Sequence, residues 1–401
     1  MKIEQLIVKN FRVYRDVEIR NLSNLSVFIG ANGSGKSTLF DVFGFLHDAL
    51  KGNVRTAIAK RGGFNEVRSR DSKGAIEFII KFRNPVVDKE LQPLITYELT
   101  IDICEKTKLP IIKKEILKYR RGQTGKPYNF LDFKEGEGTA IINEENFEKE
   151  KQSFKDHREV QKLDSPDILA IKGLGQFQKF KAISSFRRLL DNWFVSNFQI
   201  HSAQSIIDSG VSEHLSNTGD NLAQYTKYIY ENFPDEFIAI LQKLQSRVPG
   251  MDSVTAEETS DGRIVLKFKD GSFKDPFISR YVSDGTIKMF AYLMLLHDPK
   301  PHPLLCVEEP ENYLNPELLP ELAEEFREYA NKGGQVFIST HSPDFINALD
   351  VDELFWLKKG SGYTSIKKAS EDEVVNSLFT NGDKLGWLWM QGYFTGSSPK
   401  I

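Results

Sequence analysis

The chain has 401 residues, of which 27% are charged and 40% hydrophobic, and its formal net charge is -3. This composition is typical of a globular protein with one large or two ordinary domains. A charge this close to zero excludes a protein-wide basic field for nucleic acid, so any DNA contact needs a local patch. No apolar window approaches the roughly 18 residues of a membrane span, and we expect neither a signal peptide nor a membrane partner. Cys104 and Cys306 lie far apart in apolar runs, which favours core packing in a reducing cytoplasm over a disulfide.

Alternating apolar and polar residues predict two strands at the start of the chain, over 2–8 and 13–20. A third run, Leu25 to Ile29, is continuously apolar and β-rich, which predicts a short buried strand. From Ser37 to Leu50 the apolar residues recur at helical spacing. The sequence therefore predicts a buried strand that a short connection joins to a helix.

That connection is Gly30-Ala31-Asn32-Gly33-Ser34-Gly35-Lys36-Ser37, which fits the pattern G-x-x-x-x-G-K-[ST] in full. Its glycines let the backbone close around phosphates, and the N–H groups at the helix start face the anion. Lys36 would reach the β- and γ-phosphates, and the Ser37 hydroxyl would ligate Mg²⁺. An accidental Gly/Ser turn is the alternative, but the flanking strand and helix disfavour it. The pattern predicts a nucleoside triphosphate site formed by Asn32, Gly33, Ser34, Gly35, Lys36, Ser37 and Thr38.

The middle of the chain indicates further strands and then helices. Strands are expected over 76–82 and 96–103, and a hairpin over 116–119 and 128–133 across the turn 121–125. The charged run 143–165 indicates a solvated helix or a mobile excursion. Residues 177–198 carry a helical apolar stripe interleaved with Lys179, Lys181, Arg187 and Arg188. A core-packed amphipathic helix is the favoured interpretation, with a DNA-facing patch as the alternative. Helices over 222–230 and 234–244 and a strand over 264–268 follow.

The second half carries acids and a histidine at the ends of predicted strands. Leu304 to Val307 is an apolar run that ends in Glu308, Glu309, Pro310 and Glu311, and the next apolar run, 335–340, ends at His341. Far downstream of a phosphate loop, such a strand predicts that Glu308 holds Mg²⁺ and that Glu309 orients or deprotonates the attacking water. His341 suits a sensor of the γ-phosphate. Surface acids that cap a strand and a structural histidine are the alternatives.

Ser283 and Gly285 lie in Val282-Ser283-Asp284-Gly285-Thr286, which opens a helix with Ser283 as its N-cap. The order of these motifs resembles that of an ABC-type ATPase head: Walker A at 30–37, signature at 282–286, Walker B at 308–309, D-loop at 315–316 and switch histidine at 341. Val8-Lys9-Asn10-Phe11-Arg12 and the Glu-Glu-Pro-Glu sequence are similar to the SMC/RecF-like branch, and most similar to its compact members described as AAA-type ATPases.

The resemblance implies an α/β fold, a P-loop NTPase head with a mixed central sheet, an antiparallel β lobe and a helical region between the two halves. It implies an N-terminal ATPase half at 1–82, an inserted β/helical region at 83–200 in place of a coiled coil, and a C-terminal half at 201–401. It also implies a homodimer in which two heads enclose two ATP molecules, with Ser283 and Gly285 of one head at the γ-phosphate bound by the other. Arg12 would help to hold the nucleotide.

The sequence departs from the family pattern in two places. The signature lacks its usual first glycine and final glutamine, and Glu308 stands where aspartate is commoner. The predicted function is a Mg²⁺-dependent, ATP-hydrolysing dimeric switch in DNA repair or anti-phage defence, with DNA or a separate nuclease or Toprim-like effector as partner. The alternatives are a transporter nucleotide-binding subunit and the head of a self-contained OLD-like nuclease.

Overall fold

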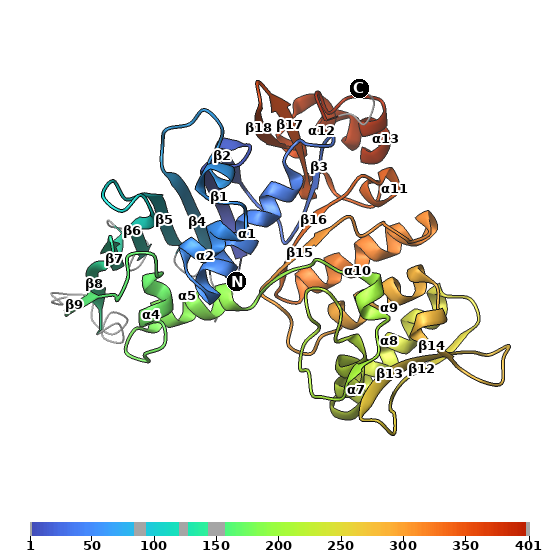
Figure 1. The fold of residues 1–401 in the computed structure, drawn as a ribbon. Coiled ribbons are helices and arrows are strands. Elements are labelled where there is room, and N and C mark those ends of the chain that lie inside the picture. The colour runs from blue at the N-terminus through green and yellow to red at the C-terminus, as the bar shows by residue number, and fades with distance from the viewer. Residues whose placement is uncertain (1, 84–93, 120–126, 143–156, 398–401) are drawn as a thin grey trace, which may run out of the picture. The chain divides into compact units, whose positions relative to one another are not determined.

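The structure is a computed structural model that describes residues 2–83, 94–119, 127–142 and 157–397 (Figure 1). The chain divides into two compact units, the first made of Met1–Trp193 with Asp350–Ile401 and the second of Phe194–Leu349. The short strand β10 (Trp193–Val195) lies where the chain passes from the first unit into the second. The three-part division expected from the motifs stays a prediction.

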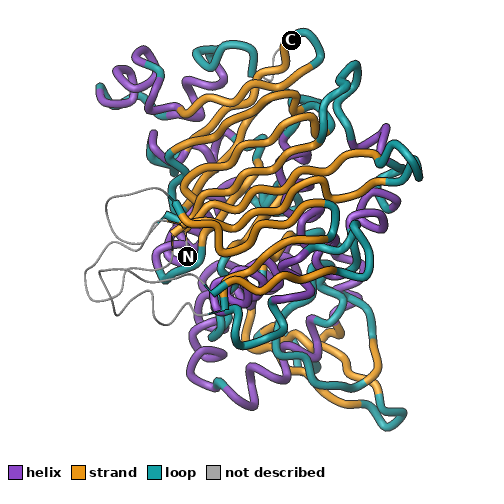
Figure 2. Tube along the Cα trace, turned by 90° about the vertical axis from the view of Figure 1, so that its left-hand side faces the viewer, coloured by secondary structure: helices purple, strands orange, loops and turns teal. Residues whose placement is uncertain are grey.

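The largest sheet of the first unit is antiparallel (Figure 2), and among the described residues its strand order is β2-β1-β4-β5-β6-β7-β8-β9. One face of its strands is buried because apolar residues alternate with polar ones, as in Ile76, Phe78, Ile80 and Phe82. The strands are β1 (Lys2–Phe11), β2 (Tyr14–Arg20), β4 (Ile76–Arg83), β5 (Ile95–Ile103), β6 (Pro110–Tyr119), β7 (Tyr128–Lys134), β8 (Glu137–Ile141) and β9 (Arg158–Lys162).

Strand β9 corrects part of the prediction for the charged run 143–165. Its residues Arg158 to Lys162 pair with β8 at the edge of the sheet instead of forming a solvated helix or an excursion. An edge strand with no buried face has no apolar period, so its composition resembles that of a solvated segment. The remainder of the run up to residue 156 and the predicted turn 121–125 lie outside the described residues.

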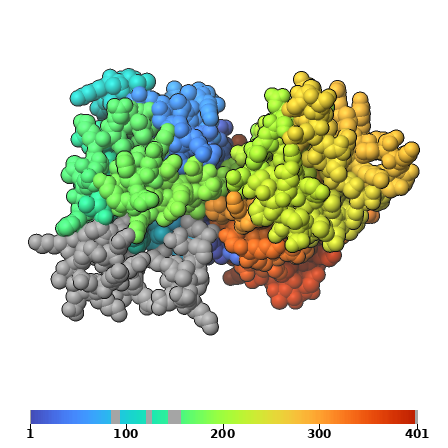
Figure 3. Space-filling model, turned by 90° about the horizontal axis from the view of Figure 1, so that it is seen from below, coloured from blue at the N-terminus to red at the C-terminus, as the bar shows by residue number. Residues whose placement is uncertain are grey.

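Five helices of the described part of the first unit accompany this sheet: α1 (Lys36–Lys51), α2 (Val54–Ala59), α3 (Phe64–Val67), α4 (Ala170–Leu174) and α5 (Lys181–Asp191). On α1, Phe45 packs against Phe11 of β1 and Phe78 of β4, with ring centroids 5.7 and 5.5 Å away. The predicted amphipathic core helix is confirmed as α5, whose Phe186 lies 4.9 Å from the ring of Phe82. It is shorter than expected and ends before β10. Figure 3 shows the green segment around α4 and α5 on the surface of the first unit.

A second set of strands in the first unit carries the phosphate loop. Strand β3 (Leu25–Ile29) is buried throughout and runs parallel to β17 (Leu354–Gly360), which pairs with β18 (Tyr363–Lys368) in an antiparallel hairpin. Phe28 of β3 stacks on Phe355 of β17 at 5.2 Å. The last helices of the chain are α12 (Glu373–Thr380) and α13 (Leu385–Met390), and short 3₁₀ turns are η4 (Val351–Glu353) and η5 (Ala369–Glu371).

The second unit contains helices, a pair of parallel strands and an antiparallel sheet. Its parallel pair is β15 (Leu304–Glu308) with β16 (Gln335–Ser339), and its antiparallel sheet is β11 (Ile207–Asp208), β13 (Arg263–Asp270), β12 (Met251–Glu258) and β14 (Phe277–Ile278). Helix α9 (Asp284–Leu296) is central because every residue from Ile287 to Leu296 is buried. The other elements are α6 (Ile200–Ala203), α7 (Leu222–Asn232), α8 (Pro234–Arg247), α10 (Leu319–Asn331), α11 (Pro343–Ile346), η2 (Ser279–Tyr281) and η3 (Pro316–Leu318).

Over the described ranges of both units, none of the helices combines the length and apolar character required to cross a membrane.

Candidate functional site

The phosphate loop leaves β3 and enters α1 through backbone conformations that favour glycine. Gly33 has a φ of 73° and Gly35 a φ of 105°, both in the left-handed region. A Cβ on Gly35 would also lie 2.9 Å from Thr364 Oγ1 and from the ring of Tyr14. The loop therefore requires glycine at 35 for both conformation and space.

Lys36 is the first residue of α1, and its side chain folds back over the loop. Its ammonium donates to the carbonyl oxygens of Gly30 and Ala31, at 2.7 and 3.3 Å. Asn32 and Ser37 are exposed on the same loop and first turn, while Ser34 is buried. The geometry thus gathers a cation, a hydroxyl and the backbone of a helix start, which is the donor set that binds phosphate.

Two buried side chains that the sequence analysis missed hold this loop in place. The Tyr14 hydroxyl donates to Gly35 O at 2.7 Å, and Thr364 Oγ1 donates to Ser34 O at 2.6 Å. Burial raises the pKa of Tyr14 above its ordinary value, so its phenol keeps the proton it donates. Local sequence gives no signal for Thr364, because it reaches the loop from β18, far along the chain.

Arg12 lies in the turn between β1 and β2 and has a φ of 50°. Its Nε is 2.7 Å from Asp41 Oδ2 on α1, and its backbone N–H donates to Val67 O at 2.7 Å. Asp41 Oδ1 accepts from Arg61 Nε at 2.7 Å. Arg12 is therefore anchored on the helix that begins at the phosphate loop, and its contact with nucleotide stays a prediction.

The acidic residues of the second unit stand at the carboxyl end of β15. Glu308 lies opposite Ser339 in the parallel register, and Glu309 leaves the strand with a φ of 47°. The Glu309 N–H donates to Ser339 O at 2.8 Å, which fixes this unusual backbone. The strand therefore ends at Glu308, and Glu309 begins the turn that follows it.

Around Glu309 the structure gathers His341 and Asn312. Asn312 Nδ2 donates to Glu309 Oε2 at 2.9 Å, and His341 Nε2 lies 3.6 Å from Glu309 Oε1. The His341 N–H donates to Glu311 Oε1 at 2.6 Å, and burial raises the pKa of Glu311. Of the predicted residues, Glu309 and His341 thus lie together, and the third glutamate of the run supports the histidine backbone.

Lys288 of α9 joins this group, although the sequence analysis did not select it. Its ammonium donates to Glu309 O at 3.2 Å and to Asn312 O at 2.8 Å. Burial lowers the Lys288 pKa to about 8, while the carboxylates of Glu311 and Glu309 act in the opposite direction. The sequence contained one signal that could have identified Lys288, since it is a lone lysine in the apolar sequence of α9. A buried lysine of this kind needs a polar partner.

The predicted signature residues begin the same helix. Ser283 is exposed, and its hydroxyl accepts from the Thr286 N–H at 3.3 Å, which confirms the predicted N-cap. A Cβ on Gly285 would lie 2.6 Å from Tyr313 O, so this close approach of two backbones requires glycine. The predicted site residues thus form two groups: Arg12 with residues 32–38 in the first unit, and Ser283, Gly285, Glu308, Glu309 and His341 in the second.

Residues 25–347 match a protein family described as "AAA domain, putative AbiEii toxin, Type IV TA system". The comparison with curated proteins gives no match. Among solved structures the chain is similar to an SMC head bound to the C-winged helix domain of ScpA, with a TM-score of 0.55 and 15% identity over 92% of this chain and 98% of that one.

Two other SMC heads match less well. The head from Thermotoga maritima has a TM-score of 0.45 at 12% identity, over 92% of this chain and 99% of its own. The Pyrococcus furiosus head with an extended coiled coil, bound to the C-terminal domain of ScpA, has a TM-score of 0.49 at 14% identity, over 95% and 99%. At such identities the first likeness shows the fold alone, an α/β fold of the SMC-head type, as the sequence analysis predicted.

Proposed function

The chain belongs to the AAA-domain family that its residues 25–347 match, a family of P-loop ATPase domains, and on this basis we propose that it hydrolyses ATP with Mg²⁺ as a dimeric switch. The observation that carries the proposal is the phosphate loop, where Gly33 and Gly35 open the backbone and Lys36 is held over it. Such a loop binds the phosphates of a nucleotide through backbone N–H groups and one ammonium.

The residues at the end of β15 supply the groups that hydrolysis needs. Glu309 has a carboxylate within 3.6 Å of His341 Nε2, and Asn312 orients its other oxygen. We assign Glu309 as the base that activates water and His341 as the γ-phosphate sensor. Glu308 and the Ser37 hydroxyl are oxygen ligands of the kind that Mg²⁺ prefers. When bound, the ion would neutralise charge on the phosphate oxygens.

ATP binding and turnover of matched variants test this assignment. Lys36→Ala should weaken ATP binding at least 100-fold, because it removes the ammonium that meets the phosphates. Glu309→Gln should keep ATP affinity within about threefold and lower kcat at least 100-fold, because it removes the base. The controls are Lys73→Ala and Glu236→Gln, which change exposed residues of each unit. Normal turnover in Glu309→Gln would contradict the role of that residue.

The switch would act with a partner in DNA repair or, as the family description with its toxin term favours, in anti-phage defence. The partner would be DNA or a separate nuclease or Toprim-like effector, and the thiols of Cys104 and Cys306 support a reducing cytoplasm. The affinity of the ATP-bound protein for DNA should fall steeply with salt if DNA is the partner. Two heads would enclose two ATP molecules, with Ser283 and Gly285 contacting the nucleotide of the other copy.

A further inference from the structure

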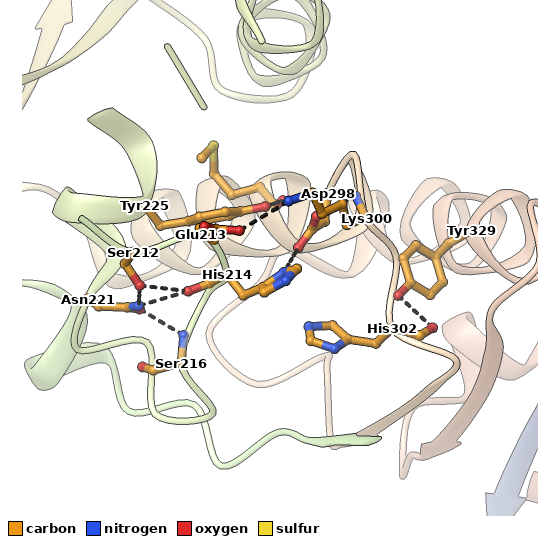
Figure 4. Close-up of polar contacts among 11 residues, drawn as sticks. Ser212, Glu213, His214, Ser216, Asn221, Tyr225, Asp298, Lys300, His302 and Tyr329 are labelled. Atoms are coloured by element: carbon orange, nitrogen blue, oxygen red, sulfur yellow. Dashed lines mark hydrogen bonds and ion pairs between the residues drawn. The ribbon is translucent and has the colours of Figure 1, made fainter. Parts of the chain in front are cut away.

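Two histidines and an aspartate of the second unit converge in the structure, and none of the three is a predicted site residue. Ligand atoms of His214, Asp298 and His302 all lie within 4.8 Å of one another. His214 Nδ1 is 2.8 Å from Asp298 Oδ2, and the rings of His214 and His302 are 5.3 Å apart (Figure 4). The carboxylate of Asp298 is almost completely buried, at 2% exposure, whereas His214 is 40% exposed. The cluster thus has a buried acidic centre and an accessible imidazole.

We propose that His214, Asp298 and His302 bind one Zn²⁺ ion. Two imidazoles and one carboxylate are the nitrogen and oxygen ligands that zinc accepts at three protein positions, with a water as the fourth ligand. Ligand atoms of a tetrahedral zinc site, at about 2.0–2.1 Å from the ion, lie about 3.3 Å apart. The pair at 2.8 Å and the limit of 4.8 Å bracket this spacing, so a small rotation of the histidine rings completes the site.

The groups around the cluster hold two of its ligands in place, as metal sites require. Asp298 Oδ1 accepts from the Lys300 N–H at 2.8 Å, which orients this carboxylate. The His302 carbonyl oxygen accepts from the Tyr329 hydroxyl at 3.2 Å. Asp298 is therefore oriented with Oδ2 toward His214, while the backbone of His302 is fixed to α10.

The loop that carries His214 is held in the same way. Asn221, at the start of α7, donates from Nδ2 to His214 O at 2.9 Å and accepts from the Ser216 N–H at 2.8 Å. Ser212 Oγ donates to the same carbonyl oxygen at 3.0 Å. These side-chain contacts fix the backbone of the loop, so His214 is held beside Asp298, to which its Nδ1 is already bonded.

The position of the cluster in the fold indicates which segments the ion would link. His214 precedes α7, Asp298 follows α9, and His302 comes two residues before β15. One ion would link the loop before α7 to the connection that leads into β15. Since Glu308 ends β15 and the cluster stands at its start, the ion would stabilise the strand that carries the acidic residues rather than contact them.

Zinc titration of the nucleotide-free full chain tests the proposal. The metal-stripped protein should bind one Zn²⁺ per chain in competition with a chromogenic chelator. His214→Gln and His302→Gln should each weaken this binding at least 100-fold, because each removes a ligand. The matched control His201→Gln changes an exposed histidine of the same unit and should bind as the wild type does. Glu308→Gln should also keep the binding, which separates this site from the predicted Mg²⁺ ligands.

Cobalt gives a readout that needs no variant. Co²⁺ added to the metal-stripped wild type should produce visible absorption bands of a four- or five-coordinate site, and Zn²⁺ should abolish them. Circular dichroism establishes whether each variant is folded. Absence of these bands, absence of stoichiometric zinc binding, or unchanged affinity in both folded histidine variants would overturn the proposal. If a variant does not fold, the cobalt spectrum of the wild type decides.

Discussion

Glu115 shows how one buried side chain can make the stability of the chain depend on pH. This carboxyl group of β6 is 1% exposed and accepts from the N–H groups of Ala170 and Ile171 at 2.6 and 3.1 Å. The Tyr97 hydroxyl also donates to it at 3.1 Å. Burial nevertheless raises the Glu115 pKa to about 7, because desolvation outweighs the three donors.

The first prediction concerns the sign of this pH dependence. The pKa of Glu115 is 4.5 in the unfolded chain and about 7 in the folded one, so the folded state binds more protons between these values. The free energy of unfolding therefore falls as the pH rises from 4.5 to 7, by about 3 kcal/mol for this group. Urea unfolding from pH 5 to 8 should show this slope in the wild type and in the exposed control Glu105→Gln. Glu115→Gln should lose it, and an equal slope in both variants would contradict the assignment.

Lys288 carries the second prediction at this scale, as a positioning residue. Lys288→Met removes the donor to the carbonyl oxygens of Glu309 and Asn312, so the Glu309 turn should shift. We expect kcat to fall about tenfold to 100-fold, since a small displacement of a catalytic group has effects of this size. The KM for ATP should stay within about threefold, because the phosphate loop is unchanged. Exposed Lys332→Met is the control, and a changed KM with unchanged kcat would contradict the positioning role.

At the scale of elements, the hairpin of β17 and β18 supports the phosphate loop. Thr364→Val keeps the shape of the side chain and removes the hydrogen bond to Ser34 O, which leaves this oxygen without that donor. We expect a loss of about 1–3 kcal/mol in unfolding free energy and weaker ATP binding. Calorimetric ATP titration and urea unfolding measure the two effects. Ser365→Ala, which changes an exposed hydroxyl of the same strand, should leave both unchanged. Wild-type ATP affinity in Thr364→Val would show that the loop holds its shape without the hairpin.

The sequence predicted those elements whose own residues decide their structure. The apolar run of β3, the helical spacing of α1 and the N-cap Ser283 are local signals, and all three are confirmed. Strands β12 and β18 were missed, because their inward residues are few and the alternation is weak. The prediction for the charged segment that forms β9 was wrong for a related reason. This strand is held by its pairing with β8 and has no buried face that would show in the sequence.

The residues of the candidate site also fall into two groups, those that local sequence predicts and those that it does not. The loop 30–37 and the acids at the end of β15 follow from contiguous motifs, so sequence alone located them. Tyr14 and Thr364 act through contacts with segments distant in the chain, and no local pattern encodes such contacts. Lys288 stands out as a lone lysine in the apolar sequence of α9, but that pattern does not say which residues it contacts. The cluster of His214, Asp298 and His302 was missed for the same reason, because His214 lies 84 or more positions before its two partners in the sequence.

At the scale of the whole molecule, the proposed dimer follows from the switch function. Glu309→Gln should slow hydrolysis and accumulate the ATP-bound form. With Mg·ATP its mass in light scattering should rise from 45.8 kDa to twice that value. The same protein without nucleotide should stay at the mass of one chain. A monomer saturated with ATP would refute the enclosed-nucleotide dimer, and a dimer under both conditions would show that another surface assembles it.

Ser283 tests which surface forms that dimer. Ser283→Arg in the Glu309→Gln background puts a large cation at the exposed start of α9, so ATP should bind normally while the dimer fails to form. Ser283→Asn keeps an N-cap of similar strength without the added bulk, and should dimerise as the parent does. Dimers of the arginine variant would contradict a role for the signature of one head at the nucleotide of the other.

The split arrangement of the first unit has a consequence for synthesis on the ribosome. Residues 194–349 are made between the two parts of that unit, so β3 is translated long before its parallel neighbour β17. At about 5–20 residues per second, β17 follows β3 after roughly 20–60 s. During that interval the nascent chain contains the phosphate loop without Thr364, the side chain that later bonds to Ser34 O. The loop therefore gains its hydrogen bond from Thr364 only after residues 194–349 have been made.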